Sequence, residues 1–228
     1  MLALSELIGR PVRDPSGDEP GRLRDLAVRL AEPYPLVTRL RLGRGRKRRV
    51  VDWERISEIR PRALRLSSPL DGAVDGPLRG DEIWLAEHVL DTQVIDIAGR
   101  RLVRVGDVAL ERDRDALRLV GVEIGKAAVL RRLGLRGLGE RAGSELVDWR
   151  DLHLTSGRGH SLQLRTTASR VHRLTAEELD AVVARLTPHR AAEVLETVQP
   201  VPVEAVVRRR PRPRRYHRVL SARRRAPS

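Results

Sequence analysis

The stretches VVDWERI (50–56) and LVDWRDL (146–152) are nearly the same seven residues, and they contain two of the three tryptophans in this chain of 228 residues. A composition rich in Arg and Leu produces some short matches by chance. The alternative is that the chain contains one structural module twice, and a repeat of that kind would decide the fold.

Further matches support the repeat. An offset of 82 residues aligns Val12 and Asp14 with Val94 and Asp96, Gly17 with Gly99, and RLRDLAV (22–28) with RVGDVAL (104–110). The VDW triplets align at an offset of 96, so the second copy carries 14 extra residues (96 − 82), which we place in the insertion 125–144. A third offset, 98, aligns Leu64 and Leu66 with Leu162 and Leu164. Matches in this order predict a duplication.

Each copy is predicted to consist of short β-strands. Apolar and polar residues alternate most clearly over LVTRLRL (36–42), as in a half-buried strand, and the glycines that follow allow a reversal into 48–52. DPSG (14–17) has the residues of a turn. The other predicted strands are 9–14, 22–30, 93–97, 102–110 and 117–124. Regular short strands favour small barrels, so the predicted fold class is mainly β, with two small β-barrels in tandem.

Composition and charge limit the kinds of core and binding site that this chain can form. The chain is 40% hydrophobic but has no Phe, so its core must consist of Leu, Val, Ile and Ala. The absence of Cys excludes disulfides and zinc sites with Cys ligands. The net charge is +14, but residues 199–228 hold ten Arg and one acid and contribute +9 of it, which leaves +5 for the rest. The basic character is therefore concentrated in the tail.

A change of pattern follows the second copy. Thr175 and Glu178 form a capping box, and Leu179, Val182 and Val183 lie on one face at helical spacing. Pro188 suits the first position of a second helix, which is predicted to run to about 198. The tail 199–228 has five Pro and ten Arg, so it is predicted to be disordered.

The repeat resembles the PRC-barrel, the small β-barrel of the photosynthetic reaction-centre H subunit and of the ribosome-maturation factor RimM. Both copies have its G-x-x-V-x-D…G first hairpin, or most of it, an R-x-x-D second strand and a closing VDW. The residues are Gly9, Val12, Asp14, Gly17, Arg22, Asp25 and 51–53, then Val94, Asp96, Gly99, Arg104, Asp107 and 147–149. The resemblance covers about 1–168 and implies a structural rather than a catalytic unit.

The segment LTAEELDAVVARLTPHRAAEVLETV (174–198) resembles the opening of the helical N-terminal domain of MgtE-type magnesium transporters. That resemblance implies a cytosolic, regulatory role in magnesium homeostasis. It is also the only reason to consider Mg²⁺ as a ligand, since the sequence predicts no cofactor. The family's helical domain is several times longer. The tail is therefore either native or the product of a frameshift after codon 198, which the DNA beyond that codon would distinguish.

The repeated Asp52-Trp53 and Asp148-Trp149 pairs have two interpretations. Each Trp is either a binding-surface aromatic or a side chain that covers the end of a barrel, with the Asp capping the following turn. Duplicated positions in a diverged repeat favour the structural interpretation, so these four residues are predicted to anchor the repeats.

The densest basic run outside the tail is a candidate anion-binding surface. The residues of this run are Arg44, Arg46, Lys47, Arg48 and Arg49, which either bind RNA or an anionic lipid surface or form a solvated hairpin turn. The six His have no metal-ligand spacing, and metal ligands therefore stay unknown. The glycine-rich stretches miss the phosphate-loop and dinucleotide patterns, and no nucleophile elbow occurs, so the chain is predicted not to be an enzyme.

The predicted organisation is a first PRC-barrel at 1–80, a second at 81–168, a helical fragment at 172–198 and the disordered basic tail. The predicted function is that of a non-catalytic binding or regulatory module in magnesium transport, with a protein partner such as a membrane transporter. An RNA- or ribosome-associated adaptor and a membrane-surface adaptor are the alternatives. With no signal peptide and no span of about 20 apolar residues, the expected location is the cytoplasm, including the inner face of the membrane.

Overall fold

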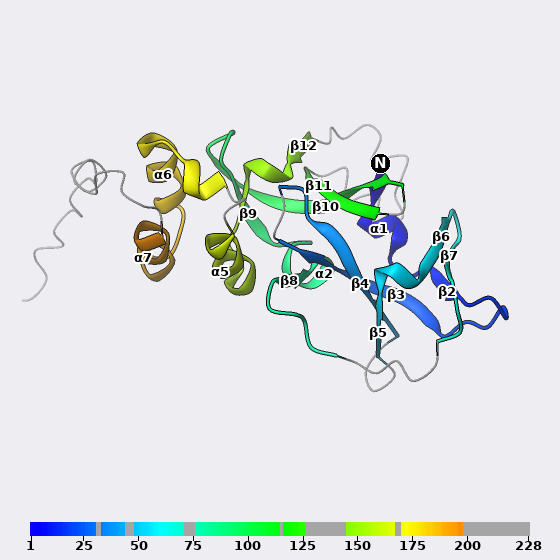
Figure 1. Ribbon diagram of the computed structural model, residues 1–228. Helices are drawn as coiled ribbons and strands as arrows, with labels where there is room; N and C mark the ends of the chain where they lie inside the picture. Colours follow the sequence, from blue (N-terminus) through cyan, green and yellow to red (C-terminus); the bar gives the residue numbers. More distant parts are fainter. Residues whose placement is uncertain are drawn as a thin grey trace, which may run out of the picture.

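The computed structural model describes residues 1–30, 33–43, 48–70, 76–114, 116–125, 145–166 and 170–197. The described part is mainly β, as predicted (Figure 1). The first half consists of β1 (Leu2–Ala3), α1 (Leu4–Leu7), β2 (Pro11–Arg13), β3 (Gly21–Arg29), β4 (Leu36–Leu42), β5 (Arg49–Asp52), the 3-10 turn η2 (Trp53–Arg55), β6 (Ile56–Arg60) and β7 (Ala63–Leu66). The second half consists of β8 (Glu82–Trp84), α2 (Leu85–His88), β9 (Gln93–Asp96), β10 (Arg101–Asp113), β11 (Ala116–Ile124), β12 (Glu145–Asp148), η3 (Trp149–Asp151), β13 (Leu152–Leu154) and α5 (Gly157–Arg165). The chain continues with η4 (Arg170–Arg173), α6 (Ala176–Val183) and α7 (Pro188–Thr197).

The strand registers confirm the offsets of 82 and 96. Leu40 of β4 lies opposite Leu26 of β3 and Val51 of β5. Val122 of β11, 82 residues later, lies opposite Val108 of β10 and Val147 of β12. The extra residues of the second half therefore fall in the β11–β12 connection. The predicted insertion 125–144 lies, except for Gly125, outside the described residues.

β-bulges occur at the same places in both halves. In the β3–β4 pair the register shifts between Leu23 and Asp25 and again between Ala27 and Val28. In the β10–β11 pair it shifts at the positions 82 residues later, before Asp107 and after Ala109. A bulge bends and twists its strand locally, so the two halves share this distortion as well as their pairing.

The repeated motif aspartates hold turns. The Oδ1 atom of Asp14 accepts a hydrogen bond from the backbone N–H of Asp18 at 3.0 Å, and Gly17 adopts the positive φ of 91° that its turn requires. In the second half the Oδ1 atom of Asp96 accepts from the N–H of Gly99 at 2.8 Å. The aspartates therefore act as turn caps, which explains their recurrence in both copies.

The third predicted correspondence is wrong. Leu64 and Leu66 lie in strand β7, whereas Leu162 and Leu164 lie in helix α5. All four side chains are buried, but in elements of different type. Leucine is frequent in this chain, so a pair of leucines two residues apart can recur in elements of different type. The similarity of the halves ends after the 3-10 turns η2 and η3, because the next strand of the first half, β6, pairs with β7, whereas the next strand of the second half, β13, pairs with β9.

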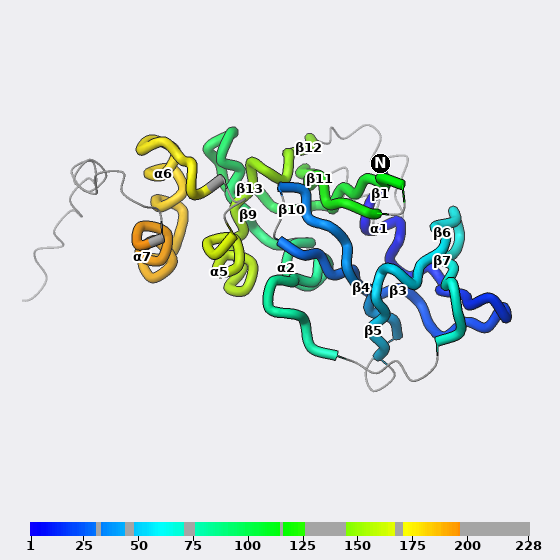
Figure 2. Tube along the Cα trace, viewed as in Figure 1, coloured from blue at the N-terminus to red at the C-terminus, as the bar shows by residue number. Residues whose placement is uncertain are grey.

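Each half contributes its first strand to the sheet of the other half. β1 pairs with β10 through Leu2 opposite Leu110, and β8 pairs with β3 through Ile83 opposite Val28. Figure 2 shows the N-terminal segment beside the green strands of the second half. The exchange is reciprocal, since the partner positions Val28 and Leu110 are themselves 82 residues apart.

Two buried aspartates receive the exchanged helices. Asp25 accepts a hydrogen bond from the N–H of Ala86 in α2 at 2.7 Å, and Asp107 accepts from the N–H of Ser5 in α1 at 3.1 Å. Each aspartate also accepts from the next N–H of its own strand at 2.8 Å, and each side chain is fully buried. The repeated R-x-x-D position therefore links the halves rather than serving one half alone.

The two halves are joined in one sheet about an approximate two-fold axis. Leu36 of β4 pairs with Arg118 of β11, and these two residues are equivalent positions of the repeat because they are 82 apart. An antiparallel pair of equivalent residues lies on a two-fold axis. The path through the sheet, β13-β9-β10-β11-β4-β3-β2-β7-β6, is open. Among the described residues, the hydrogen bonding thus gives a single open sheet of thirteen strands rather than two separate closed barrels.

The core and the helical end follow from this arrangement. One apolar cluster contains buried residues of both halves, including Leu4, Leu26 and Leu110. A second, smaller cluster joins Ile95 and Ile97 of the β9 region to α5, η4, α6 and α7. Figure 1 shows α6 and α7 at one end of the molecule and the β6–β7 hairpin at the other.

The structure confirms both predicted helix starts at this end. Thr175 and Glu178 form the capping box of α6, with each side chain bonded to the other residue's backbone N–H, and α7 begins at Pro188. The predicted tail 199–228 lies outside the described residues. Among the residues that are described, no helix has both the length and the apolar character needed to cross a bilayer.

Candidate functional site

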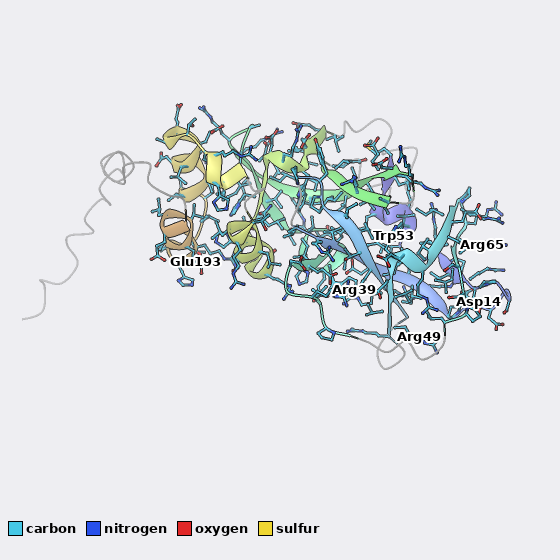
Figure 3. All side chains as sticks on the ribbon, viewed as in Figure 1. Asp14, Arg39, Arg49, Trp53, Arg65 and Glu193 are labelled. Carbon is cyan, nitrogen blue, oxygen red and sulfur yellow. The ribbon has the colours of Figure 1, made fainter. Side chains whose placement is uncertain are left out.

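The predicted anion-binding run is only partly within the described residues. Arg44, Arg46 and Lys47 lie outside them. Arg48 is exposed, and Arg49 is partly exposed at the start of β5, opposite Leu42. Figure 3 shows Arg49 at the far end of β5 from Trp53. The described part of the run therefore lies beside the hairpin loop, apart from the site described next.

The four predicted repeat anchors differ in their contacts. Trp53 and Trp149 are both buried in the main cluster. The carboxylate of Asp148 caps η3, as predicted, by accepting from the N–H of Arg150 at 2.9 Å. Asp52 makes no such cap; it accepts instead from a guanidinium N–H of Arg79 at 3.0 Å. The cap expected for Asp52 is thus wrong, because Arg79, outside the repeated motif, binds that carboxylate.

A cleft of about 680 Å³ opens beside Trp53. Its volume is within the range of small-molecule and side-chain pockets. Its walls come from β3, β4, β6, η2, the segment before β8 and the first residue of β11. The lining residues are Arg29, Leu36, Val37, Thr38, Asp52, Trp53, Glu54, Ile56, Ser57, Arg79 and Ala116. The lining of the cleft combines apolar side chains with polar side chains of both positive and negative charge.

A buried ion pair lies behind this cleft. Glu82 of β8 is fully buried and accepts from the guanidinium of Arg39, from the Thr38 hydroxyl at 2.7 Å and from the N–H of Arg79 at 3.0 Å. Burial by itself would raise the pKa of Glu82, but these hydrogen bonds outweigh burial and lower it. Glu82 is therefore ionised at neutral pH. It holds the Thr38 hydroxyl and the backbone of Arg79 in place, and both of these residues line the cleft.

The corresponding place in the second half is occupied by Tyr34. Its hydroxyl donates a hydrogen bond to the Oδ2 atom of Asp148 at 2.9 Å, and the guanidinium carbon of Arg150 lies 5.0 Å from the ring centroid. The latter distance is that of a cation–π contact. Burial and the hydrogen bond to Asp148 raise the pKa of the Tyr34 hydroxyl, so it remains a proton donor at neutral pH.

A pair of buried histidines connects the sheet to the helical end. The Nε2 atom of His153 in β13 lies 2.8 Å from the Nδ1 atom of His160 in α5, and both rings are fully buried. The Nε2 atom of His160 lies 3.1 Å from a carboxylate oxygen of Glu193 in α7, which Figure 3 labels. Glu193 also pairs with the exposed His189 at 3.1 Å.

Burial and, to a smaller extent, the neighbouring His160 lower the pKa of His153 to about 3, so His153 is neutral near pH 7. Within the described residues no group of three or more His, Cys, Asp or Glu side chains is placed to hold a metal ion. The histidine pair was not predicted from the sequence, because a spacing of seven residues between His153 and His160 is no recognisable motif.

The equivalence of Ala116 and Tyr34 is present in the sequence but is hard to recognise there. The offset of 82 that aligns the other anchors also aligns these two residues, but a tyrosine opposite an alanine does not look like a match. The difference becomes meaningful only once their surroundings are known.

No protein-family model, no curated protein and no solved structure matches the chain.

Proposed function

We propose that the chain is a binding and regulatory module that acts in magnesium transport or homeostasis through contact with an MgtE-like partner. The observation that carries this proposal is the attachment of the helical segment to the sheet. The segment that resembles MgtE-type helices folds as α6 and α7, and these helices are packed against the β9 region through their own apolar cluster. A rigid sheet thus presents them at one end of the molecule.

The outward side of α7 is suited to a protein contact. Ala192 and Glu196 are exposed, whereas Ala191 and Val194 of the same helix are buried against the second cluster. The helix therefore uses one side to attach to the module and leaves the other side free for a partner. The PRC-type nature of the two halves is part of the proposal and rests on the sequence motifs. Each half would be a PRC-type unit completed by the exchanged strand of the other half.

Binding to a transporter tests the proposal. The full chain is immobilised, and the detergent-solubilised MgtE-type transporter of the same organism is passed over it. Ala192→Glu combined with Glu196→Lys should weaken the interaction at least tenfold, because it changes the shape and the charge of the exposed side of α7. Arg65→Glu, on an exposed position of β7 at the other end of the molecule, is the matched control and should bind as the wild type does (Figure 3). Equal binding by all three proteins, or none by the wild type, contradicts the proposal.

Mg²⁺ itself supplies a second measurement. If the module senses the ion directly, millimolar Mg²⁺ should raise the thermal midpoint of the full chain, since a ligand that binds the folded state stabilises it. Ca²⁺ at the same concentration serves as the control for general ionic effects. An unchanged midpoint would leave the transporter contact as the only link to magnesium.

An RNA-associated adaptor is the second candidate, and the observation that favours it is the exposure of Arg48 beside the basic run. Arg48→Ala combined with Arg49→Ala should then reduce the salt dependence of RNA binding. The slope of log K against log [salt] should become less steep by about 1.4 to 1.8 if both side chains contact phosphates. An unchanged slope would assign any RNA binding to other residues.

A further inference from the structure

The two halves place different residues at one equivalent position. Arg39 and Gly121 are 82 residues apart, and they lie opposite Asp52 and Asp148 respectively. Asp52 and Asp148 are therefore structural equivalents. Tyr34 and Ala116 are equivalents by the same offset of 82, two residues before the Leu36–Arg118 pair on the approximate two-fold axis.

In the second half, the Tyr34 ring packs beside η3 and its hydroxyl reaches the equivalent aspartate. The hydroxyl lies 2.9 Å from Asp148, and Arg150 lies over the ring. Tyr34 thus fills its site with an apolar ring and makes a hydrogen bond there with its polar hydroxyl.

In the first half, the position of Tyr34 is held by Ala116, and the cleft opens there. Ala116, Asp52 and Trp53 all line it. A methyl group in place of a phenol leaves the aspartate without the hydroxyl donor that its equivalent has. Within the described part of the chain Asp52 pairs only with Arg79, and both side chains are about half exposed, at 52% and 51%. A pair that is so exposed contributes little and gives way readily to another donor.

We propose that the cleft beside Trp53 binds the side chain of a tyrosine from a partner protein, with the ring against Ala116 and Trp53 and the hydroxyl donating to Asp52. The cleft is thus a copy of the Tyr34 site that has lost its internal occupant. Its volume exceeds that of one side chain, so residues flanking the tyrosine enter with it. The rim groups Arg29, Glu54 and Ser57 are placed to hydrogen-bond the flanking peptide.

The charges around the proposed site differ from those around Tyr34. Glu54 stands where the second half has Arg150, since these residues are 96 apart. The cleft lining also includes Arg29 and Arg79, so both carboxylates and guanidinium groups border the proposed site. This inference does not depend on the transporter contact of α7, which lies on different elements.

Two amides provide the direct probe. N-acetyl-tyrosinamide and N-acetyl-phenylalaninamide are titrated into the full chain, and binding is followed by the NMR shifts of the tryptophan side-chain N–H groups. Tyrosinamide should bind roughly fivefold more tightly than phenylalaninamide, the ratio that one hydrogen bond of typical strength gives.

Variants assign the binding to this cleft. Ala116→Tyr should fill it with an internal phenol and abolish binding of tyrosinamide, while Ala192→Tyr, which adds a tyrosine to the exposed side of α7, should leave binding unchanged. Asp52→Ala, at a half-exposed position where folding is not at risk, should bring the two amides to equal affinity. Tyrosinamide binding that survives Ala116→Tyr overturns the proposal, as does an equal affinity for both amides in the wild type.

The source of the tyrosine is tested with Tyr216, the chain's only other tyrosine. If Tyr216→Ala binds tyrosinamide no better than the wild type does, the cleft is open to a partner, as proposed. Binding that appears only in Tyr216→Ala would overturn the partner as the source, because the chain's own tail would then be the occupant.

Discussion

Asp25 and Asp107 are equivalent residues whose electrostatic surroundings differ. Beside Asp25 the repeat has Arg41, whose guanidinium lies 2.9 Å from the carboxylate, and the residue at the position of Arg41 in the second half is Glu123. Asp107 is bound by the Ser5 hydroxyl instead. Burial raises the pKa of Asp25 to about 6, although the hydrogen bond from Ala86 and the charge of Arg41 act against it.

The raised pKa of Asp25 predicts that this residue makes a pH-dependent contribution, or term, to the free energy of unfolding. Between pH 3.8 and about 6 the folded protein keeps a proton that the unfolded chain has released, so this term falls as pH rises through that window. From pH 5 to pH 7.5 the loss is about 1 kcal/mol. Urea unfolding of Asp25→Asn should show no such term. Relative to the wild type, the variant should therefore be less stable at pH 5 by about 1 kcal/mol more than at pH 7.5, and a difference independent of pH would contradict the prediction.

His153 predicts a term of the opposite sign. Its folded pKa of about 3 lies below the usual 6.5, so the unfolded chain binds a proton first and stability falls as pH falls below 6.5. Acidification from pH 7.5 to pH 5 should cost about 2 kcal/mol. His153→Gln should remove most of this cost, and the term from His160, which faces Glu193 and Arg190, should remain.

His189→Gln is the matched control for His153, because that ring is 87% exposed. Urea unfolding at the two pH values measures all three proteins. The control should keep the acid sensitivity of the wild type. If His153→Gln kept it too, the buried imidazole would not be its source.

At the scale of elements, Arg39 and Glu82 fix β8 on β3 and β4. Both side chains are buried, at 8% and 0% exposure, and they come from different halves of the chain. Removing one partner of a buried pair leaves an uncompensated charge, which is costly, whereas an exposed pair contributes less than about 1 kcal/mol.

Arg39→Met should therefore destabilise the fold by about 3 kcal/mol, measured by urea unfolding at pH 7.5. The double variant Arg39→Met/Glu82→Gln should be at least about 1 kcal/mol more stable than Arg39→Met, because the stranded charge is gone. Arg29→Met, which breaks an exposed pair with Asp81, is the control and should cost under about 1 kcal/mol. Equal losses in the single and the double variant would show that the pair's charge is not the cause.

Elements with a clear local pattern were predictable from the sequence. Strand β4 has the bounds 36–42 that its alternation predicts, and α6 starts at its capping box. Helices α1 and α2 were missed because four residues do not complete a periodic pattern. The alternation also treated Arg39 as a solvent-facing residue, since the sequence does not reveal that Glu82 would bury it. Of the cleft, the sequence identified Asp52 and Trp53 but assigned them only a structural role.

At the scale of the whole molecule, the strand exchange was not predictable. Local patterns identify strands but not their partners, and β1 pairs with a strand that lies more than 100 residues further along the chain. The predicted boundary near residue 80 describes the repeat in sequence, whereas the hydrogen bonds cross it in both directions. In its described part, the protein resembles a strand-exchanged dimer whose two subunits are joined in one chain.

This interlocking predicts the behaviour of the separated halves. Fragments 1–80 and 81–228 should each lack a cooperative unfolding transition as monomers, because each lacks a strand and the helix that satisfies its buried aspartate. An equimolar mixture should form a folded one-to-one complex, or each half should form an exchanged homodimer. Light scattering and urea unfolding measure both properties. A monomeric half with its own cooperative transition would contradict the prediction.

The reciprocal exchange also determines when the N-terminal segment can fold during synthesis on the ribosome. Ser5 reaches its place only after Asp107 has been translated, 102 residues later. At about 5 to 20 residues per second, the N-terminal strand and helix wait roughly 5 to 20 s for their partner. During that interval Leu4 and Leu7, which are fully buried in the finished protein, lack the partners that bury them. We therefore expect the nascent first half to bind chaperones, and slow codons between the halves to lengthen this interval.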